Sequence, residues 1–569
     1  NNFKRNVLSA RAYGELIFTP WLKFTTNIST DITDNLNATY ENKIVGDGAP
    51  GGRARRRATK TTSYTFNQLL NFSQKFGNHS IEALVGHENY DYTYNFLDGF
   101  RNGQIVDGVS ELANFTTTST LNSYVDRATI ESWLSRVNYS FNDKYLLSAS
   151  YRRDGNSRFS DKVRWGNFWS VGAGWRVDQE EFMNPVTWVD QLKLRASYGT
   201  VGNDNGIGLY PFRALYNIAS NASEPGFLQA SFENKDLSWE VNKQFDIGID
   251  FGLFGNRLTG TIEYFNRQSD NLLFEVPLPI STGILSVWKN VGSMFNRGVE
   301  IQLAGDVIRN KEFSWNVNVN WTTFRNEITK LPDGQVEIIS GTKKLMVGRS
   351  IYDFWLREWY GVDPNDGSAL YRMDIYNASN TRIIDKGATK DSVTTTSNNG
   401  RYHYNGSAIP DFYGGITNTF RYKNFELSIL INYQVGGKVY DATYATLMHP
   451  GTYGTALHVD ALKRWQNPGD VTDVPRMDNA QVGIYNAQSD RFLTDASFLN
   501  LRAVNLIYQL PAKLLGKIQA QSGRVFISGE NLALISARKG MNVGQTFTGV
   551  TSNVYVPARI VSAGINVSF

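Results

Sequence analysis

One short stretch of the sequence carries oxygen ligands at close spacing. In VDPNDGSALYRMD, the side chains of Asp363, Asn365 and Asp366 precede Gly367. Carboxylate and amide oxygens are the ligands that calcium prefers, but the spacing and the terminal glutamate of an EF-hand loop are missing. Pro, Asn, Asp and Gly also favour a plain turn. We therefore expect a turn and no metal centre, with a calcium loop on Asp363, Asn365 and Asp366 as the alternative.

Aromatic side chains in two long segments are the second feature with binding chemistry. The flat faces of Trp and Tyr suit sugar rings, and they also suit packing in a core or against a partner protein. The ligand-binding candidates are Trp355, Trp359, Tyr360, Tyr440, Tyr444, Tyr453 and Trp465. Packing is the commoner use of any single ring, so the identity of the ligand-binding residues stays open.

Enzymatic chemistry lacks its usual parts in this sequence. The five histidines are scattered, without the spacing of a metal-binding motif, at His79, His87, His403, His449 and His458. Cysteine is absent, and neither a GxSxG elbow nor a P-loop occurs. We expect no enzyme, no catalytic residue and no cofactor.

The segment RARRR concentrates positive charge at Arg53, Arg55, Arg56 and Arg57. We expect it in a long loop at 33–59, where its guanidinium groups would pair with phosphates of lipopolysaccharide. A solvated and mobile loop is the alternative. Nucleic acid is not an expected partner, because no basic face accompanies the segment.

The elements that must carry these residues are β-strands. In FSWNVNVNW, at 313–321, apolar and polar residues alternate, and the pattern recurs in segments of about ten residues, as at 245–253. No apolar stretch of about 18 residues could span a bilayer as a helix. Mean hydropathy is −0.35, and aromatic residues make up 13% of the chain. A transmembrane barrel fits these values, because it alternates its two faces and hides its hydrophobicity from any average.

About seventeen strands follow from this pattern. They start near residues 7, 21, 60, 79, 128, 144, 166, 191, 238, 256, 290, 312, 410, 424, 497, 523 and 556. Most tight connections contain three or four residues, and they alternate with long ones at 33–59, 93–127, 204–236, 270–288, 327–408, 436–494 and 533–554. An outer-membrane barrel has short turns on one side and long loops on the other. A soluble sandwich also alternates, but nothing in it would force this rhythm of loop lengths.

The last strand, ARIVSAGINVSF at 558–569, ends on Phe569. We expect a lipid-facing row at Val561, Ala563, Ile565, Val567 and Phe569, and a lumen-facing row at Ser562, Gly564, Asn566 and Ser568. The first and last predicted strands run in the same direction, so their number is odd, whereas single-chain bacterial barrels have even numbers. We therefore expect an odd number of N-terminal strands outside this chain. The last strand should meet another chain or form an open edge.

Several motifs resemble one family. They are SYRRDGNSRFS (150–160), LKLRASYGTVGN (192–203), LSWEVNKQFDIGIDFGLFGNRLTGTIEYFNR (237–267), NVGSMFNRGVEIQL (290–303), GVDPNDGSALYR (361–372), IPDFYGGITNTFRYKNFELS (409–428), RWQNPGDVTDVPR (464–476) and SGENL (528–532). Together with the terminal strand, they resemble the SusC/RagA-type TonB-dependent transporters of Bacteroidota. The matches run in the family's order from about residue 130 to the end.

The resemblance implies an all-β fold, a transmembrane antiparallel barrel of about 22 strands with a plugged lumen. Residues 1–569 would supply its C-terminal portion of about 17 strands, as one barrel domain. The N-terminal extension, the plug and about five first strands would be absent from this chain, either removed by processing or supplied as a separate chain.

The resemblance also implies a function. The protein would be integral to the bacterial outer membrane, in contact with its lipid and lipopolysaccharide, and would import oligosaccharides or peptides. A SusD-like surface lipoprotein would form a lid on the loops at 327–408 and 436–494. TonB would drive import through the missing N-terminal part, and Phe569 would be the signal read in outer-membrane assembly.

Three rival functions stay open at this point. A siderophore or cobalamin receptor that depends on TonB would share the barrel without the lipoprotein partner. A passive porin would need an unplugged lumen. A barrel that serves as a scaffold in a larger outer-membrane assembly would lack a ligand cavity and a contact with TonB.

Overall fold

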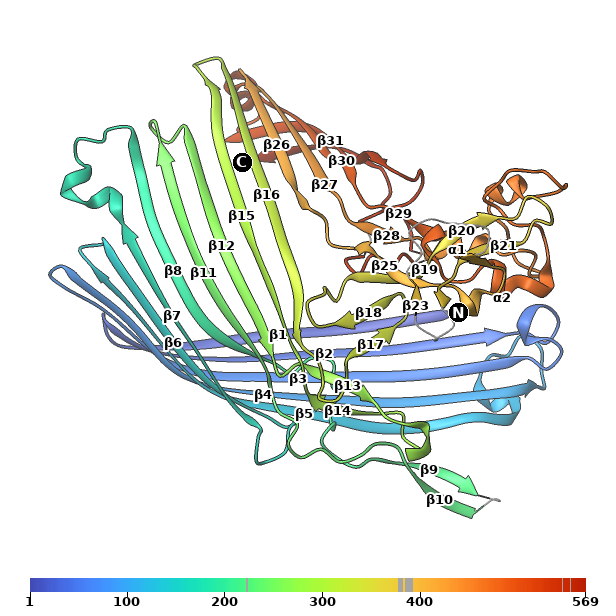
Figure 1. Cartoon of the computed structure of the whole chain (residues 1–569). Helices are drawn as coiled ribbons and strands as arrows, with labels where there is room; N and C mark the ends of the chain where they lie inside the picture. The colour runs from blue at the N-terminus through green and yellow to red at the C-terminus, as the bar shows by residue number, and fades with distance from the viewer. Residues whose placement is uncertain (222–223, 377–381, 384–391, 545, 553) are drawn as a thin grey trace. The chain divides into compact units, whose positions relative to one another are not determined.

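The computed structural model describes residues 1–569 except 222–223, 377–381, 384–391, 545 and 553. Its main feature is a sheet of 17 strands, which confirms the number predicted from the sequence (Figure 1). The chain forms two compact units, which are 1–180 with 194–245 and 268–292, and 181–193 with 246–267 and 293–569. Within the described ranges, no helix has both the length and the apolar character needed to cross a membrane.

The first unit contains a run of consecutive antiparallel strands. They are β1 (Asn2–Thr19), β2 (Leu22–Glu41), β3 (Arg53–Phe76), β4 (His79–Gln104), β5 (Phe115–Phe141), β6 (Tyr145–Asn156) and β7 (Trp165–Arg176). Each strand pairs with the next one along the chain. Three further strands belong to the same sheet, β8 (Val189–Asn203), β11 (Glu240–Leu253) and β12 (Leu258–Asp270).

The second unit contains a second run of the sheet. Its strands are β15 (Ser293–Arg309), β16 (Phe313–Lys330), β26 (Phe412–Tyr422), β27 (Phe425–Val435), β30 (Phe498–Gln509), β31 (Ser522–Ser536) and β32 (Ile560–Ser568). Here too each strand pairs antiparallel with the next in this order. The starts agree closely with prediction, as for β26, expected near residue 410 and found at Phe412.

Some strands are longer than the sequence pattern predicts, and this corrects two loops. β3 begins at Arg53 rather than near 60, and β5 begins at Phe115 rather than near 128. The predicted loops at 33–59 and 93–127 therefore shrink, because β2 and β3 stay paired as far as Glu41 and Arg53. A bilayer needs only about ten residues of a strand. In the part of a strand that extends past the bilayer, apolar and polar residues no longer alternate, although the backbone hydrogen bonds to the neighbouring strand continue.

The tight turns form where they were predicted. Asn142 and Asp143, between β5 and β6, have φ values of 54° and 55°, and Asn256, between β11 and β12, has 55°. Asn and Asp tolerate this left-handed region better than other residues with a side chain, because their short polar groups bond locally. These residues therefore suit the reversals between neighbouring strands.

Strands β6 and β7 keep large apolar side chains exposed on one face. Tyr151 pairs with Trp169, and all of Tyr151, Trp169 and Val171 are exposed. On the opposite face Ser150 and Ser170 share a hydrogen bond of 2.6 Å between their hydroxyls. Apolar rings thus share one face of these strands and polar groups the other, which suits strands with one face toward lipid.

Two hairpins and several short helical turns complete the connections. The hairpins are β9 (Tyr216–Asn221) with β10 (Glu224–Gln229), and β13 (Leu273–Pro277) with β14 (Ser286–Asn290). The 3-10 turns outside the second unit's long segments are Gly46–Gly48, Leu112–Asn114, Val177–Gln179, Glu181–Met183 and Ile280–Thr282. The helix α3 (Ala512–Lys517) precedes β31.

Two long segments of the second unit, 331–411 and 436–497, fold into small elements, and we call them the loop lobe. The first holds β17 (Glu337–Ser340), β18 (Lys343–Met346), β19 (Asp353–Arg357), β20 (Trp359–Val362), β21 (Ala369–Arg372), β22 (Ile375–Tyr376), β23 (Arg382–Ile383), β24 (Val393–Thr394), Ser397–Asn399 and β25 (Tyr402–Ser407). The second holds β28 (Lys438–Tyr440), α1 (Ala442–Leu447), Val459–Lys463, Asn479–Gln481, α2 (Val482–Tyr485), Asp490–Phe492 and β29 (Leu493–Asp495).

The two segments of the loop lobe share their cores. Phe354 and Leu356, from the first segment, are fully buried in one cluster with Phe492 from the second. A further cluster joins Tyr371 to Tyr485. The described parts of the long loops predicted at 327–408 and 436–494 are therefore folded, and their buried clusters pack the two segments on each other.

Candidate functional site

The loop lobe places two of the predicted aromatic residues around one phenylalanine. Tyr440, at the end of β28, and Tyr444, in α1, both meet Phe492 edge-on, with ring centroids 6.1 and 6.2 Å apart. Tyr440 is only 6% exposed, and burial raises the pKa of its hydroxyl to about 12. Its ring therefore belongs to the core of the lobe.

Tyr444, in contrast, lines a cavity of about 520 Å³. Arg538 covers one face of its ring, with Cζ 3.8 Å from the centroid, and His458 meets the ring edge-on at 4.8 Å. The Tyr444 hydroxyl donates to Oδ2 of Asp460 at 3.1 Å. The cavity thus has a fixed aromatic wall surrounded by groups that can donate and accept hydrogen bonds.

Trp355 and Trp359 pack within the lobe. The Trp355 ring, in β19, stacks on Tyr402 at 6.1 Å, and the Nζ of Lys344 lies 4.1 Å from its centroid. Trp359, in β20, meets Tyr371 edge-on at 5.4 Å. These contacts occupy ring surface that a sugar would otherwise cover.

Tyr360 and Tyr453 lie on the surface of the lobe. Tyr453 is 99% exposed and Tyr360 is 41% exposed. The guanidinium of Arg372 lies 5.3 Å from the Tyr360 ring. Their exposure suits contact with a ligand or a partner, and their assignment as binding residues stays a prediction.

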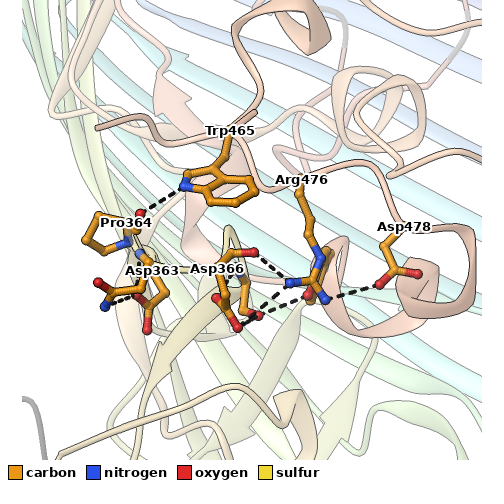
Figure 2. A network of polar contacts seen from close by, with 9 residues as sticks. Asp363, Pro364, Asp366, Trp465, Arg476 and Asp478 are labelled. Atoms are coloured by element: carbon orange, nitrogen blue, oxygen red, sulfur yellow. Dashed lines mark hydrogen bonds and ion pairs between the residues drawn. The ribbon is translucent and has the colours of Figure 1, made fainter. Parts of the chain in front are cut away.

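The oxygen-rich stretch is a closed turn, shown in Figure 2. Oδ1 of Asp363 accepts from both the backbone N–H and the side-chain amide of Asn365, each at 2.9 Å. The Asp366 carboxylate accepts from the N–H and the hydroxyl of Ser368, also at 2.9 Å. These bonds stabilise the backbone of the turn in the way that Asp commonly does.

Trp465 and Arg476 attach this turn to the second segment of the lobe (Figure 2). The indole N–H of Trp465 donates to the carbonyl of Pro364 at 3.0 Å, and Nη1 of Arg476 donates to the carbonyl of Asp366 at 2.6 Å. Gly367, at φ 75°, lies under the ring, and a Cβ there would be 2.5 Å from Trp465. Trp465 is therefore an anchor of the turn.

The turn gives no separate sign of a metal. Within the ranges that the structure describes, no group of three or more His, Cys, Asp or Glu lies where it could hold an ion. The oxygens of Asp363 and Asp366 already accept the hydrogen bonds of the turn. The calcium loop on Asp363, Asn365 and Asp366 stays an alternative that only a measurement can test.

The arginine segment lies in a strand, which corrects its placement in a mobile loop. β3 begins with Arg53, Arg55, Arg56 and Arg57. Asp98, which is 2% exposed, accepts from Nε of Arg55 at 2.7 Å and from Nη2 of Arg57 at 3.5 Å, and Arg56 donates to the carbonyl of Ser110 at 2.8 Å. Charge pairing across the strands therefore fixes these arginines, and pairing with lipopolysaccharide stays a prediction.

Phe569 follows the end of β32 and is 77% exposed. Val561 and Ile565, which were predicted to share its row, are 70% and 67% exposed. An exposed apolar row suits a lipid-facing strand. The use of Phe569 as an assembly signal stays a prediction.

Sequence reasoning missed several residues that build the site. Arg538 lies in the segment predicted as a loop at 533–554, and its guanidinium contacts Tyr444 and the carboxylate of Asp441. Phe492 and Arg476 were also not singled out. Their partners lie far away along the chain, so no spacing in the sequence signals the contact.

Comparisons with known proteins agree with this architecture. A family model described as "TonB dependent receptor-like, beta-barrel" matches residues 4–441. TonB-dependent receptor P3 of Formosa agariphila is 28% identical over 100% of this chain and 58% of its own length. TonB-dependent receptor SusC of Bacteroides thetaiotaomicron is 26% identical over 89% of this chain and 50% of its own length.

The solved structure of the RagAB peptide transporter is also similar. It covers 100% of this chain with a TM-score of 0.86 and 26% identity, and the match takes up 62% of that chain. The chain thus spans roughly half to three-fifths of the length of the relatives that it matches.

Proposed function

The chain belongs to the TonB-dependent receptor-like β-barrel family, and we propose that it is the C-terminal barrel portion of an importer of the SusC/RagA type. The family consists of outer-membrane transporters and not of enzymes. The observation that carries the proposal is the likeness to the RagAB peptide transporter over the whole chain, including the loop lobe.

The proposed cargo is an oligosaccharide or a peptide. The structural relative is described as a peptide transporter, and the polar cavity beside Tyr444 has the mixed aromatic and hydrogen-bonding lining that either cargo would need. A SusD-like lipoprotein is the proposed partner, and the folded surface of the loop lobe is the proposed place for it. Exposed rings such as Tyr453 supply the kind of anchor that protein interfaces favour.

The remaining strands and the plug are proposed to come from the N-terminal part of the longer protein. β1 pairs with β2, and β32 pairs with β31. Each of these pairings covers one of the two edges of β1 or β32. An unpaired edge cannot lie in lipid, because its N–H and C=O groups would lack partners. Additional strands would satisfy these groups, and TonB would act through the same N-terminal part.

Uptake by cells tests this function. A strain that lacks the full-length gene should lose uptake of labelled oligosaccharides or peptides and regain it on complementation. Uptake should also stop when TonB is deleted or the proton gradient is collapsed. A lipoprotein should co-purify with the full-length receptor in detergent. Uptake that persists without TonB would indicate a passive porin, and uptake of iron chelates alone would indicate a siderophore receptor.

A further inference from the structure

A bulge in the sheet gives Arg502 an unusual position. In the β30–β31 ladder, Leu501 pairs with Ala533 and Ala503 pairs with Glu530, so Arg502 faces the two residues between them. One of these is Asn531, whose φ is 52°. Bulges commonly redirect a side chain from the plane of pairing. Here the Arg502 guanidinium donates a hydrogen bond to the side-chain oxygen of Asn531.

Arg502 lines a cavity of about 680 Å³. Lys539 and Arg559 line it as well, together with the amide side chains of Asn432 and Asn500. No acidic residue is among the described residues that line it. Three cations and several amide-bearing residues therefore share one cavity, whose lining also contains apolar residues such as Phe498 and Ile535.

Within the described ranges, the lining of this cavity supplies no carboxylate that would neutralise its charges. The guanidinium of Arg502 donates to the neutral side-chain amide of Asn531. In the described part of the chain, neither Lys539 nor Arg559 forms an ion pair with a carboxylate. Cations that share a cavity repel one another, and an anion between them would remove that repulsion. Guanidinium and ammonium groups are the usual partners of carboxylate, sulfate and phosphate.

The wall of the cavity is held in place at three points. Val543 is 3% exposed in an apolar cluster with Val439 and Ala496, and Met541 packs against that cluster. The hydroxyl of Ser536 donates to the carbonyl of Arg538 at 3.1 Å. The side-chain amide of Asn531, in β31, donates to the carbonyl of Ala558, which precedes β32, at 3.0 Å. These contacts hold the chain on either side of Lys539 and next to Arg559, whose own side chains are exposed and free to reach a ligand.

We propose that this cavity binds an oxyanion, a carboxylate or sulfate group, carried by the imported oligomer. The proposal rests on the proposed function and adds a charge requirement to it. The cavity adjoins the one beside Tyr444, because Lys539, Met541 and Asn542 line both. An oligomer would place a neutral unit beside the tyrosine and its anionic group among the cations.

Binding to the purified full-length receptor in detergent tests the proposal without any transport step. Two matched pairs of probes are titrated by calorimetry: an oligogalacturonide with its methyl ester, and a peptide acid with its C-terminal amide. We expect one acidic probe to bind at least about tenfold more tightly than its neutral match, because that ratio corresponds to one charge-assisted hydrogen bond. The pair that shows the ratio identifies the source of the anion.

Variants separate this cavity from other basic surfaces. Lys539→Gln and Arg559→Gln should each lower the affinity of the receptor for the acidic probe by about tenfold. Its affinity for the neutral probe should not change. Arg502→Gln should have the same effect. If this substitution prevents the bulge from forming, Lys539→Gln and Arg559→Gln still test the cavity. Lys423→Gln, in the turn between β26 and β27, is the control and should have no effect.

Three results would overturn the proposal. These are equal affinity for both members of each pair, no binding of either acidic probe, and charge-selective binding that survives all three substitutions. The first two are also the results expected if the N-terminal part of the full-length receptor fills the cavity. Failure of uptake alone would count against the proposed function and not against the cavity, because the titration does not depend on transport.

Discussion

The guanidinium of Arg538 lies 3.8 Å from the centre of the Tyr444 ring. Arg538 follows β31, whereas Tyr444 belongs to α1 in the loop lobe, so this contact attaches the segment between β31 and β32 to the lobe. The same guanidinium lies 3.4 Å from the carboxylate of Asp441, whose side chain is 7% exposed. The pair therefore fixes one wall of the cavity beside Tyr444.

Arg538→Gln should loosen this wall. It removes the contact with the ring and leaves the buried carboxylate of Asp441 without its cation, which should cost about 2 kcal/mol of local stability. Hydrogen exchange followed by mass spectrometry should show faster exchange at 442–447 and 537–544. Arg538→Lys keeps the charge and should give a smaller effect. Unchanged exchange in both variants would mean that the contact does not hold the segment.

The second prediction concerns pH and the connection between β7 and β8. The carboxylate of Glu180 accepts from the Tyr145 hydroxyl at 2.6 Å, from the Trp175 indole at 2.9 Å and from Lys144 at 3.1 Å. These bonds, that of Tyr145 above all, lower the pKa of Glu180 from 4.5 to about 2. The folded state then binds fewer protons than the unfolded state between these values, so its stability should fall as pH falls from 4.5 toward 2.

Glu180→Gln should reduce the loss of stability that occurs as pH falls. Thermal unfolding in detergent, followed from pH 7 down to pH 3, should show a steeper loss for the unaltered protein than for the variant. Glu181→Gln is the matched control, since the Glu181 side chain is exposed and forms no ion pair with any residue that the structure describes. Parallel curves for the unaltered protein and Glu180→Gln would contradict the prediction.

The strands were predictable because the sequence itself shows the alternation of apolar and polar residues and the lengths of the connections. The alternation in 313–321 reappears in β16, whose Trp315 and Trp321 pair with Phe420 and Gly414 of β26. The strand ends were less predictable. Arg and Thr occupy both faces of the first part of β3, beyond the region that a bilayer would cover, so the backbone pairing there leaves no pattern of hydrophobicity.

The candidate site was predictable only as a set of residues and not as an arrangement. Trp465 and Pro364 are 101 positions apart and share a hydrogen bond, and Tyr444 depends on an arginine in another segment. Their meeting depends on how the long segments fold onto each other. Spacing along a single sequence carries no information about such contacts.

The third prediction concerns Lys343, in β18 of the loop lobe. Its Nζ donates to the carbonyl of Tyr352 at 2.6 Å and lies 3.2 Å from the centre of the Phe354 ring. Burial lowers the pKa of Lys343 to about 7, which is below the ordinary value of 10.5. Between these two values the unfolded state binds more protons, so the stability of the lobe should rise as pH increases from 7 to 10.5.

Lys343→Met removes the buried cation and should stabilise the lobe at pH 6.5, on the order of 1–3 kcal/mol. The gain should shrink as pH approaches 10, and unfolding in detergent at several pH values measures it. Lys344→Met is the neighbouring control. Its ammonium pairs with Glu337 and covers Trp355, so its loss should destabilise the lobe. Destabilisation by Lys343→Met at every pH would contradict the prediction.

The fourth prediction separates the turn from the calcium loop. Because the Asp363 and Asp366 carboxylates accept the turn's own hydrogen bonds, removing calcium with EGTA should leave the melting temperature unchanged. Calorimetry with and without calcium measures this. If calcium raises the melting temperature of the unaltered protein but not that of Asp363→Asn, the calcium loop is the correct interpretation.

The last prediction uses two glycines that share a conformation but differ in surroundings. Gly367 and Gly334 have φ values of 75° and 82°, and both would be strained by a side chain. A Cβ at Gly367 would lie 2.5 Å from Trp465, whereas one at Gly334 would meet nothing within 4 Å. Gly334→Ala should therefore cost only backbone strain, about 1 kcal/mol.

Gly367→Ala should cost more, about 3 kcal/mol, because the alanine must also displace the Trp465 ring from the turn. Hydrogen exchange at 361–372 and 464–476 should quicken together in this variant and stay slow in Gly334→Ala. The joint response is the decisive part, since Trp465 and Arg476 contact the turn from the second segment. If only 361–372 responds, the two segments are not coupled through Trp465, and the lobe is held together by its buried clusters alone.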